Sequence, residues 1–478
     1  MSIDPSLPVP IYYQLKTLLL EDILQGRYGT DGQLPTEHEL CERFAISRSP
    51  VNRALRELAD EGAIIRRRGS GTFVNPHWIH RPSDGPELRV LVTEGAWDRI
   101  VRDAAPPEVR LNVATVARPA LHATLTRAVA EGRAPDVALL DAVWVSELAS
   151  AGFLHPLDEL DPAWFADEHD RDFLDACVTA GQHEGRPYGV SADADVAGLW
   201  YRRDVLAAIG HDPPTTWEEL HVAAQAAAAR GIAHPVTMPG GTRADETTTY
   251  CLVALLASNS AEVLGADGIR LDAPATVEAL AFLQRLTADG LLSRECVRWP
   301  WDRPARLLAE GAAAFSFGGS YEAGTIADAM GISVDALWDQ VGFVAVPAGP
   351  RGAPACVLGS MTYVIMRQAA NPKLAMRTLQ YLVDTERVVQ MARHTGRIPP
   401  RRSALEETVC DSPLLALTAS LVAPAAVRPQ TSAYLRVSVQ LQAMCEAVLT
   451  GRHAPAAAAT RASEMIEAIT GLPIARRA

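Results

Sequence analysis

Two short stretches near the N-terminus gather side chains suited to contact a nucleic acid. The first holds Ser47, Arg48, Ser49, Asn52 and Arg53, and the second holds Arg66, Arg67, Arg68, Gly69 and Gly71. Arginine donates paired hydrogen bonds to guanine or phosphate, asparagine can read adenine in the same way, and short hydroxyls contact phosphate oxygens. Glycine lets the backbone approach a partner closely. These residue types predict contacts with double-stranded DNA.

Three helices and a hairpin are expected to position these residues. The expected elements are a helix through Tyr12 and Ile23 that stops at Gly26, a second helix opened by the capping box of Thr36 and Glu39 and ending near Phe44, a third helix opened by Ser47 or Ser49 and ending at Gly62, and two short strands within 63–74. This order is typical of a winged helix-turn-helix, an α+β domain whose third helix enters the major groove. The alternative is a solvated three-helix module that contacts another protein.

Four motifs in this region resemble the GntR-type winged helix-turn-helix. They are PIYYQL at 10–15, GQLPTE at 32–37, SRSPVNRAL at 47–55 and GSGTFV at 69–74, and the resemblance covers about residues 8–75. It implies sequence-specific binding of an operator, usually by a homodimer on a pseudo-palindrome. The sequence departs from the family's pattern at two positions. The family usually has a DNA-contacting arginine where His38 stands, and often has one where Asn52 stands. These departures imply an atypical operator or a weaker affinity for it.

Charge divides the chain in two. The 478 residues carry a net charge of −13, but residues 1–82 contain ten Lys+Arg and ten Asp+Glu and are neutral. The remainder carries the whole acidic excess, and a breaker-rich stretch separates the two parts. We expect a DNA-binding domain at 1–76, a linker at 77–87 and a ligand-sensing domain at 88–478. With no secretory signal and no long apolar run, the chain is expected to be cytoplasmic and to avoid the membrane. The scattered cysteines predict neither a disulfide framework nor a metal site.

The large second part has the pattern of an α/β fold. Residues 88–92 and 135–141 are expected as strands, and residues 121–131 as a helix between them. Strands that alternate with helices predict a sheet covered on both faces. The length of this part predicts two lobes.

Several stretches of the second part resemble bacterial extracellular solute-binding proteins of the sugar-binding kind, the receptors of ABC importers. They lie at 135–141, 152–158, 185–190, 199–204, 213–220, 308–315, 346–350 and 395–400, in the family's order. The resemblance implies a two-lobed periplasmic-binding-protein-like fold with a ligand in the cleft between the lobes. Joined to a DNA-binding head, such a receptor would act as a sensor of a small-molecule effector.

A sugar site needs aromatic rings for the C–H faces and carboxylates, amides or arginine for the hydroxyls. The candidate ligand-binding residues, which follow expected strands or lie in loops, are Asp141, Trp144, Asp193, Asp195, Trp200, Ser320, Tyr321 and Arg397. Each has a structural alternative: the aromatic residues can belong to the core, the aspartates to solvated loops, and Arg397 to a fixed turn. Trp217 is interpreted as structural because Thr216 and Glu219 form a capping box around it. Trp299 and Trp301 fit a stacking platform or a packed surface equally.

The sequence gives little indication that the protein is an enzyme. Some GntR-type regulators carry an aminotransferase-like domain that binds pyridoxal phosphate through a lysine, but the only lysine beyond the head is Lys373, in a surface context. No nucleophile elbow, zinc-protease helix or phosphate loop occurs at a suitable junction. We therefore expect no enzyme and no cofactor, but a regulator whose operator affinity changes with a bound sugar or related solute. A carbohydrate-active enzyme and a ligand-free oligomerisation domain stay open as alternatives.

Overall fold

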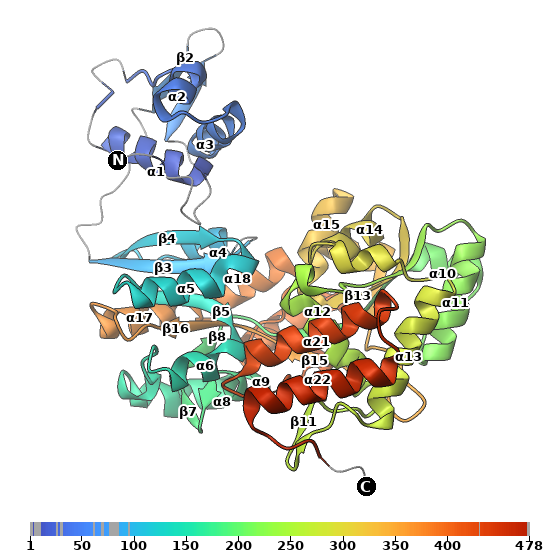
Figure 1. Cartoon of the computed structure of the whole chain (residues 1–478). Coiled ribbons are helices and arrows are strands. Elements are labelled where there is room, and N and C mark those ends of the chain that lie inside the picture. The colour runs from blue at the N-terminus through green and yellow to red at the C-terminus, as the bar shows by residue number, and fades with distance from the viewer. Residues whose placement is uncertain are drawn as a thin grey trace. The chain divides into compact units, whose positions relative to one another are not determined.

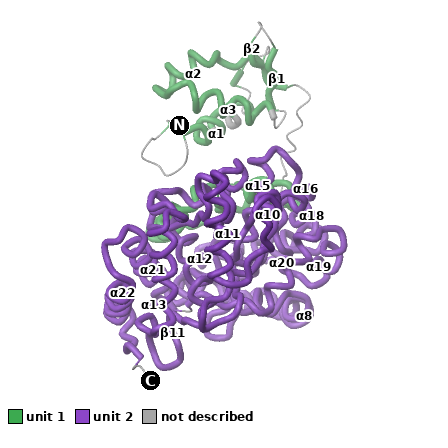
Figure 2. The backbone as a smooth tube through the Cα atoms, turned by 90° about the vertical axis from the view of Figure 1, so that its right-hand side faces the viewer, with its two compact units in different colours: residues 1–135 green, residues 136–478 purple. Residues whose placement is uncertain are grey.

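A computed structural model represents the whole chain (Figure 1). The structure describes residues 3, 11–24, 27–28, 32–60, 63–67, 71–75, 86–93, 96–429 and 431–475, without the side chains of 17, 20, 21, 24 and 60. Two compact units make up the chain, residues 1–135 and residues 136–478 (Figure 2). Most of the predicted linker at 77–87 lies outside the described residues, and the predicted domain limits stay a prediction.

The head of unit 1 contains the predicted helices and hairpin. Its elements are α1 (Ile11–Leu24), α2 (Glu37–Phe44), α3 (Arg48–Asp60), β1 (Ile64–Arg67) and β2 (Gly71–Val74). The apolar stripe of each helix turns inward, so that Leu19, Leu40 and Leu55 are buried in one core. The capping box is confirmed, since Thr36 accepts from the backbone of Glu39 and the Glu39 carboxylate accepts from that of Thr36. The expected helix ends at Gly26 and Gly62 lie outside the described residues.

The rest of unit 1 begins an α/β arrangement. Its elements are β3 (Glu87–Thr93), α4 (Trp97–Asp103), β4 (Arg110–Val116) and α5 (Leu121–Ala130). The strand expected at 88–92 and the helix expected at 121–131 are confirmed within one residue at each end. Strand β3 pairs in parallel with β4, and its residues Val90 to Val92 are buried.

Unit 2 contains strands that belong to two sheets. In one, β16 (Met361–Ile365) lies between β5 (Val137–Asp141) and β8 (Gly189–Ser191) and is antiparallel to both. In the other the order is β10 (His234–Thr237), β13 (Ala313–Gly319), β9 (Asp195–Arg202) and β14 (Val341–Val344), with β15 (Val357–Gly359) also paired to β9. Fully buried strands such as β13 are typical of sheets covered on both faces.

The chain crosses between these two sheets at neighbouring points. Strand β8 ends at Ser191 and β9 begins at Asp195, while β15 ends at Gly359 and β16 begins at Met361. The two crossings lie side by side, because Gly359 pairs with Asp195 and Thr362 pairs with Ser191. A third segment, residues 423–429, lies against the second crossing: the backbone N–H of Leu358 donates to the carbonyl of Ala426 at 2.8 Å. We call residues 191–195, 359–361 and 423–429 the first, second and third crossing segments.

Helices cover the sheets and supply the residues near the crossing segments. Those that bear on the site are α6 (Val145–Ser150), α9 (Asp175–Ala180), α11 (Trp217–Ala229), α12 (Glu246–Ala257), α13 (Pro274–Ala288), α18 (Thr385–Thr395), α21 (Tyr434–Leu449) and α22 (Pro455–Thr470), with the short 3₁₀ helices η2 (Ala142–Trp144) and η7 (Ser320–Glu322). Helices α21 and α22 pack against each other and against α13 (Figure 1). Among the described helices, none combines the length and the apolar character that a membrane span requires.

Candidate functional site

Several of the head residues that are predicted to contact DNA surround one carboxylate. Glu37, the first residue of α2, accepts from Arg48 Nε at 3.1 Å and from a terminal nitrogen of Arg66 at 3.0 Å. With its amide nitrogen turned toward Glu37, Asn52 donates to the same carboxylate at 2.6 and 3.1 Å. Glu37 thus holds residues of α2, α3 and β1 in one cluster, which orients the side chains expected to contact DNA.

The remaining predicted DNA contacts that the structure describes are on the surface. Ser47 and Ser49 are exposed at the start of α3, and the side chain of His38 is 84% exposed beside Glu42. Arg53 lies over the ring of Tyr12, with its guanidinium carbon 3.8 Å from the ring centroid. The described wing residues are Arg67, which is exposed, and Gly71, whose φ of 117° belongs to the region that favours glycine. Arg68 and Gly69 lie outside the described residues.

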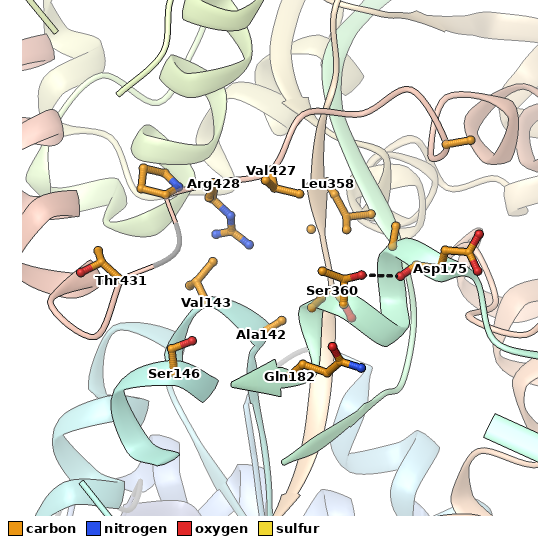
Figure 3. Close-up of a pocket in the computed structure, with 16 residues that line it drawn as sticks. Ala142, Val143, Ser146, Asp175, Gln182, Leu358, Ser360, Val427, Arg428 and Thr431 are labelled. Carbon is orange, nitrogen blue, oxygen red and sulfur yellow. Dashed lines mark hydrogen bonds between the residues drawn. The ribbon is translucent and has the colours of Figure 1, made fainter. Parts of the chain in front are cut away.

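A cavity of about 270 Å³ opens beside the crossing segments of unit 2 (Figure 3). Its described lining comes from η2 and the start of α6, from α9 and Gln182, from residues 358–360 at the second crossing segment, and from residues 423 and 427–429 of the third, with Thr431 beyond it. Small and apolar residues such as Ala142, Val143 and Leu358 make up much of the wall. Ser146, Gln182, Ser360, Thr431 and Arg428 supply polar groups. The arrangement can enclose a small solute and hydrogen-bond it.

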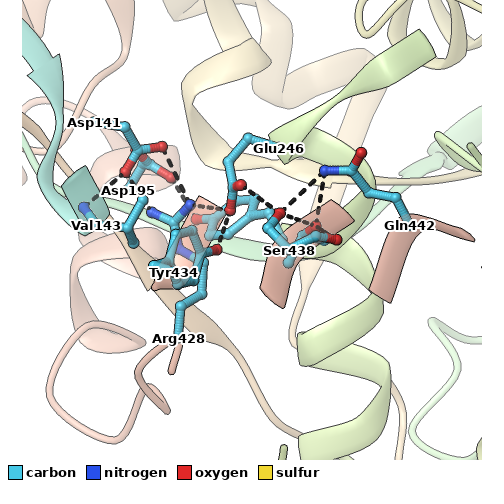
Figure 4. A network of polar contacts seen from close by, with 10 residues as sticks. Asp141, Val143, Asp195, Glu246, Arg428, Tyr434, Ser438 and Gln442 are labelled. Carbon is cyan, nitrogen blue, oxygen red and sulfur yellow. Dashed lines mark hydrogen bonds and ion pairs between the residues drawn. The ribbon is translucent and has the colours of Figure 1, made fainter. Parts of the chain in front are cut away.

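Arg428 is the charged centre of this cavity and was not predicted. Its two terminal nitrogens reach the two oxygens of Asp141 at 2.8 and 3.1 Å, and one of them also reaches Glu246 at 2.8 Å. Figure 4 shows the guanidinium lying between the two carboxylates. Asp141 ends β5 and Glu246 begins α12, so that Arg428 connects elements on both sides of the crossing segments.

Glu246 is the more deeply buried of the two acids that contact Arg428. Its carboxylate accepts from the hydroxyl of Tyr434 and from that of Ser438, the latter at 2.8 Å. Burial raises the pKa of Glu246 from 4.5 to about 7, and the neighbouring carboxylate of Asp141 also raises it, against the opposing effect of Arg428. Ionisation of this group near neutral pH therefore carries a free-energy cost in the folded protein.

The predicted Asp193 and Arg397 form an ion pair at the first crossing segment. The Asp193 side chain is fully buried, and its other oxygen accepts from the backbone N–H of Met361 at 2.7 Å. Arg397, just past the end of α18, has a side chain that is 11% exposed. These two predicted residues are brought together, and their contacts tie the first crossing segment to the second.

Asp195 and Tyr321, two further predicted ligand residues, both lie near Tyr250. Tyr250 of α12 donates its hydroxyl hydrogen to Asp195. Burial raises the pKa of Asp195 to about 6, and the carboxylate of Asp193 adds to the rise. The ring of Tyr321 lies 6.3 Å from that of Trp301 and 6.4 Å from that of Tyr250, measured between centroids.

The other predicted ligand residues have core environments. Trp200 is fully buried, packs on Phe343 and donates from its indole nitrogen to the carbonyl of Gly319 at 3.0 Å. Trp144 is 5% exposed in η2, and Ser320, 1% exposed, accepts from the backbone N–H of Val196. None of the three is among the described residues that line the cavity. Direct ligand contact by these three residues stays a prediction.

The structure also shows the surroundings of Trp217, Trp299 and Trp301, which are not among the candidate ligand-binding residues. Trp217 stacks on Phe282 at 4.8 Å and donates to Ser258, and Thr216 caps α11, which confirms the structural interpretation. Trp299 packs edge-on against His234, whereas Trp301 approaches Tyr321. Neither tryptophan is among the described residues that line the cavity.

Sequence reasoning missed Arg428, Glu246, Tyr250 and Tyr434. Arg428 lies between Val427 and Pro429 in a stretch without periodicity, and only its contacts across the fold distinguish it from other arginines. Glu246 had one local indication, because an acid in the first turn of a helix is favourable there. That indication is too common to mark a site.

Comparison with known proteins identifies both parts of the chain. Residues 93–387 match the bacterial extracellular solute-binding protein family, and residues 11–74 match the gntR family of bacterial regulatory proteins. The head is similar to the HTH-type transcriptional repressor NagR of Bacillus subtilis (strain 168), with 44% identity over 75 residues, which are 16% of this chain and 31% of that protein.

Solved structures show the fold of the larger part. An ABC transporter solute-binding protein of Thermotoga lettingae TMO, bound to α-D-tagatose, aligns with a TM-score of 0.73 and 21% identity over 80% of this chain and 100% of its own. The maltose-bound MalE3 protein of T. maritima aligns with a TM-score of 0.72 and 23% identity over 80% and 99%. The predicted winged helix-turn-helix followed by a two-lobed α/β domain is confirmed. Both matched families are regulator or binding families. The chain belongs to the bacterial extracellular solute-binding protein family, and its residues 11–74 match the gntR family of bacterial regulatory proteins.

Proposed function

We propose that this protein is a ligand-responsive transcriptional regulator. The head binds operator DNA, and the cavity beside the crossing segments binds a sugar or a related small solute. The observation that carries the proposal is the union, in one chain, of a gntR-family head and a solute-binding domain with a cavity of about 270 Å³ beside its crossing segments. A solute-binding domain joined to a DNA-binding domain can act as a sensor of the solute.

Three further points belong to the proposal. The protein works as a homodimer in the cytoplasm, because a regulator of this kind reads two half-sites about one helical turn apart. Arg48, Arg53, Asn52 and His38 contact the operator, together with the hydroxyls of Ser47 and Ser49 and the wing. Uncharged carbohydrates are the first effectors to test, because α-D-tagatose and maltose are bound in the similar structures.

Ligand binding changes operator affinity through the crossing segments. Asp141, Asp193 and Arg397, all expected near the ligand, lie in or beside these segments. Arg428 connects Asp141 to Glu246 at the start of α12. A solute in the cavity alters the balance of these contacts and hence the relation between the two sheets. A conformational change whose two states differ in affinity for both the solute and the operator couples the two sites.

The test uses the full chain and a duplex that it selects from a random-sequence pool. Operator affinity is measured by fluorescence anisotropy at fixed salt, with and without a solute found by thermal shift. The proposal predicts that saturating solute changes the operator dissociation constant by about fivefold or more. An unchanged dissociation constant would show that the cavity does not regulate the head.

A further inference from the structure

One donor of Arg428 has no hydrogen-bond partner among the described residues. The residue is 6% exposed, and its terminal nitrogens are held by Asp141 and Glu246. Its Nε–H is buried and has no hydrogen-bond partner among the described residues. An unpaired buried donor is costly, so native proteins rarely keep one without a function or a bound partner.

This donor belongs to a residue that lines the cavity. Figure 3 shows the guanidinium of Arg428 projecting into the space bordered by Val143, Val427 and Leu358. A solute in this space lies beside the guanidinium group that carries the Nε–H. A ligand oxygen that comes within hydrogen-bond distance of the Nε–H would complete the hydrogen bonds of Arg428 without breaking its two ion pairs.

The charge of Arg428 is already balanced. Two carboxylates surround one guanidinium, so the group carries no surplus positive charge. The other charged residue of the described lining is Asp175, which pairs with Arg402 at 2.8 Å. An anionic ligand would meet nearby carboxylates without a free cation, and such like-charge contacts disfavour binding. A hydroxyl accepts the Nε–H without this cost.

The wall of the cavity is unsuited to a long carbohydrate. Its described lining contains no aromatic ring for stacking, because Trp200 packs on Phe343 and Tyr321 lies with Trp301 and Tyr250. Ser146 and Gln182 provide hydrogen-bonding groups instead. The volume of about 270 Å³ also lies just below the usual range of ligand cavities, about 300–1,000 Å³.

We propose that Arg428 determines the specificity of the cavity for an uncharged polyol of one-ring size, either a monosaccharide or an open-chain sugar alcohol. The Nε–H donates to a ligand hydroxyl, while Asp141 and Glu246 keep the guanidinium from attracting anions. The inference rests on the proposed function, since it names the ligand class of the same cavity. It also makes the polar groups, not aromatic stacking, responsible for recognition.

Calorimetric titration of the full chain with matched solutes tests the ligand class. The probes are glucose, galactose, mannose and fructose with their sugar alcohols, the uronates and 6-phosphates of the same sugars, and maltose and maltotriose. The tightest ligand is expected to be an uncharged monosaccharide or sugar alcohol, with its charged counterpart at least about tenfold weaker. Tighter binding of a uronate, a phosphate or maltotriose overturns the inference but leaves the proposed function standing. Binding of no probe counts against the proposed function itself.

Variants of the full chain test the role of Arg428. Arg428→Lys keeps a cation beside Asp141 and Glu246 but removes the Nε–H, so affinity for the preferred solute should fall by about tenfold or more. The matched control is Arg285→Lys, which changes an exposed arginine paired with Glu218 on α11 and should leave binding unchanged. Unaltered affinity in Arg428→Lys overturns the inference.

Asp141→Asn provides a second test that does not depend on the lysine variant. Removing one of the two carboxylates takes away a negative charge that an anionic ligand would meet, so the affinity for a uronate relative to its parent sugar should rise by about tenfold. The variant keeps the shape of the side chain and the second partner, Glu246. If the ratio stays at the wild-type value, the balance of charge around Arg428 does not set the ligand class.

Discussion

Arg428 donates from both terminal nitrogens to the two carboxylate oxygens of Asp141, at 2.8 and 3.1 Å, although 287 positions separate the two residues. Planar, paired contacts of this kind fix the orientation of both side chains. Asp141 also accepts from the backbone N–H of Val143, so the pair sets the position of η2 at the edge of the cavity. The contact therefore links the third crossing segment to the wall that a ligand would touch.

Removing one partner of this pair should lower stability. In Asp141→Asn the guanidinium of Arg428 keeps only Glu246, and the free energy of unfolding should fall by about 2 kcal/mol, less than for a fully broken buried pair. Urea denaturation of the full chain measures the change. Glu218→Gln, which breaks the exposed pair with Arg285, should cost less than about 1 kcal/mol. Equal costs would mean that Asp141 and Arg428 contribute no more than a surface pair.

The ion pair at the first crossing segment should matter more. Arg397→Ala leaves the fully buried carboxylate of Asp193 without its cation, and breaking a buried pair costs about 3–5 kcal/mol. The melting temperature of the full chain should drop clearly. Arg393→Ala serves as the control, because Arg393 pairs with Glu407 on the surface. A melting temperature as high as that of the control would contradict the buried-pair interpretation.

Glu246 should make stability depend on pH. Its pKa rises from 4.5 to about 7 on folding, because of burial first, so the folded protein holds this proton more tightly than the unfolded chain does. The associated stability is fully present below about pH 4.5 and is lost as pH rises through about 7. The loss is on the order of 3 kcal/mol for a shift of this size. Asp195, with a pKa raised to about 6, adds in the same direction.

The pH effect is isolated by Glu246→Gln. The amide cannot ionise, while Arg428 keeps Asp141 as its partner, so the decline in stability between pH 5 and pH 8 should shrink. Denaturation series at several pH values provide the comparison. Glu218→Gln, at an exposed position, should keep the wild-type pH profile. The account of Glu246 is wrong if its glutamine variant follows that profile as well.

The head should bind DNA through Arg48 and Arg53. Arg48→Ala removes a side chain that is 77% exposed at the start of α3, and a lost base contact should weaken operator binding by about 1–3 kcal/mol. If Arg48 instead contacts only phosphate, the salt dependence of the logarithm of affinity should fall by about one unit. Arg43→Ala is the control, because Arg43 lies over Phe44 near Asp22 of α1. Equal effects in both variants would argue against α3 as the reading helix.

Local sequence was informative where local contacts decide the structure. The head was predicted well because the capping box of Thr36 and Glu39 and the apolar stripes of α1 and α3 depend on neighbours three or four positions apart. The capping of α11 by Thr216 is another case. Each pattern carries its physical cause within a single turn of helix.

The cavity was less predictable because its contacts join distant positions. Nothing near Arg428 in the sequence announces Asp141 or Glu246, and only the fold brings them together. Aromatic residue types are ambiguous for a similar reason: Trp200 has the composition of a stacking residue and the environment of a core residue. Asp193 and Arg397 were both candidates, but their mutual ion pair could not be foreseen.

Reciprocal coupling tests the central claim most directly. Calorimetry measures the dissociation constant of the tightest solute with the free full chain and with the chain saturated by its selected operator. Anisotropy measures operator affinity with and without that solute under the same salt and temperature. The account predicts that the two ratios are equal and differ from one by about fivefold or more, since a coupling free energy acts identically on both ligands. Ratios of one in both directions would contradict it, because the solute and the operator would then bind independently.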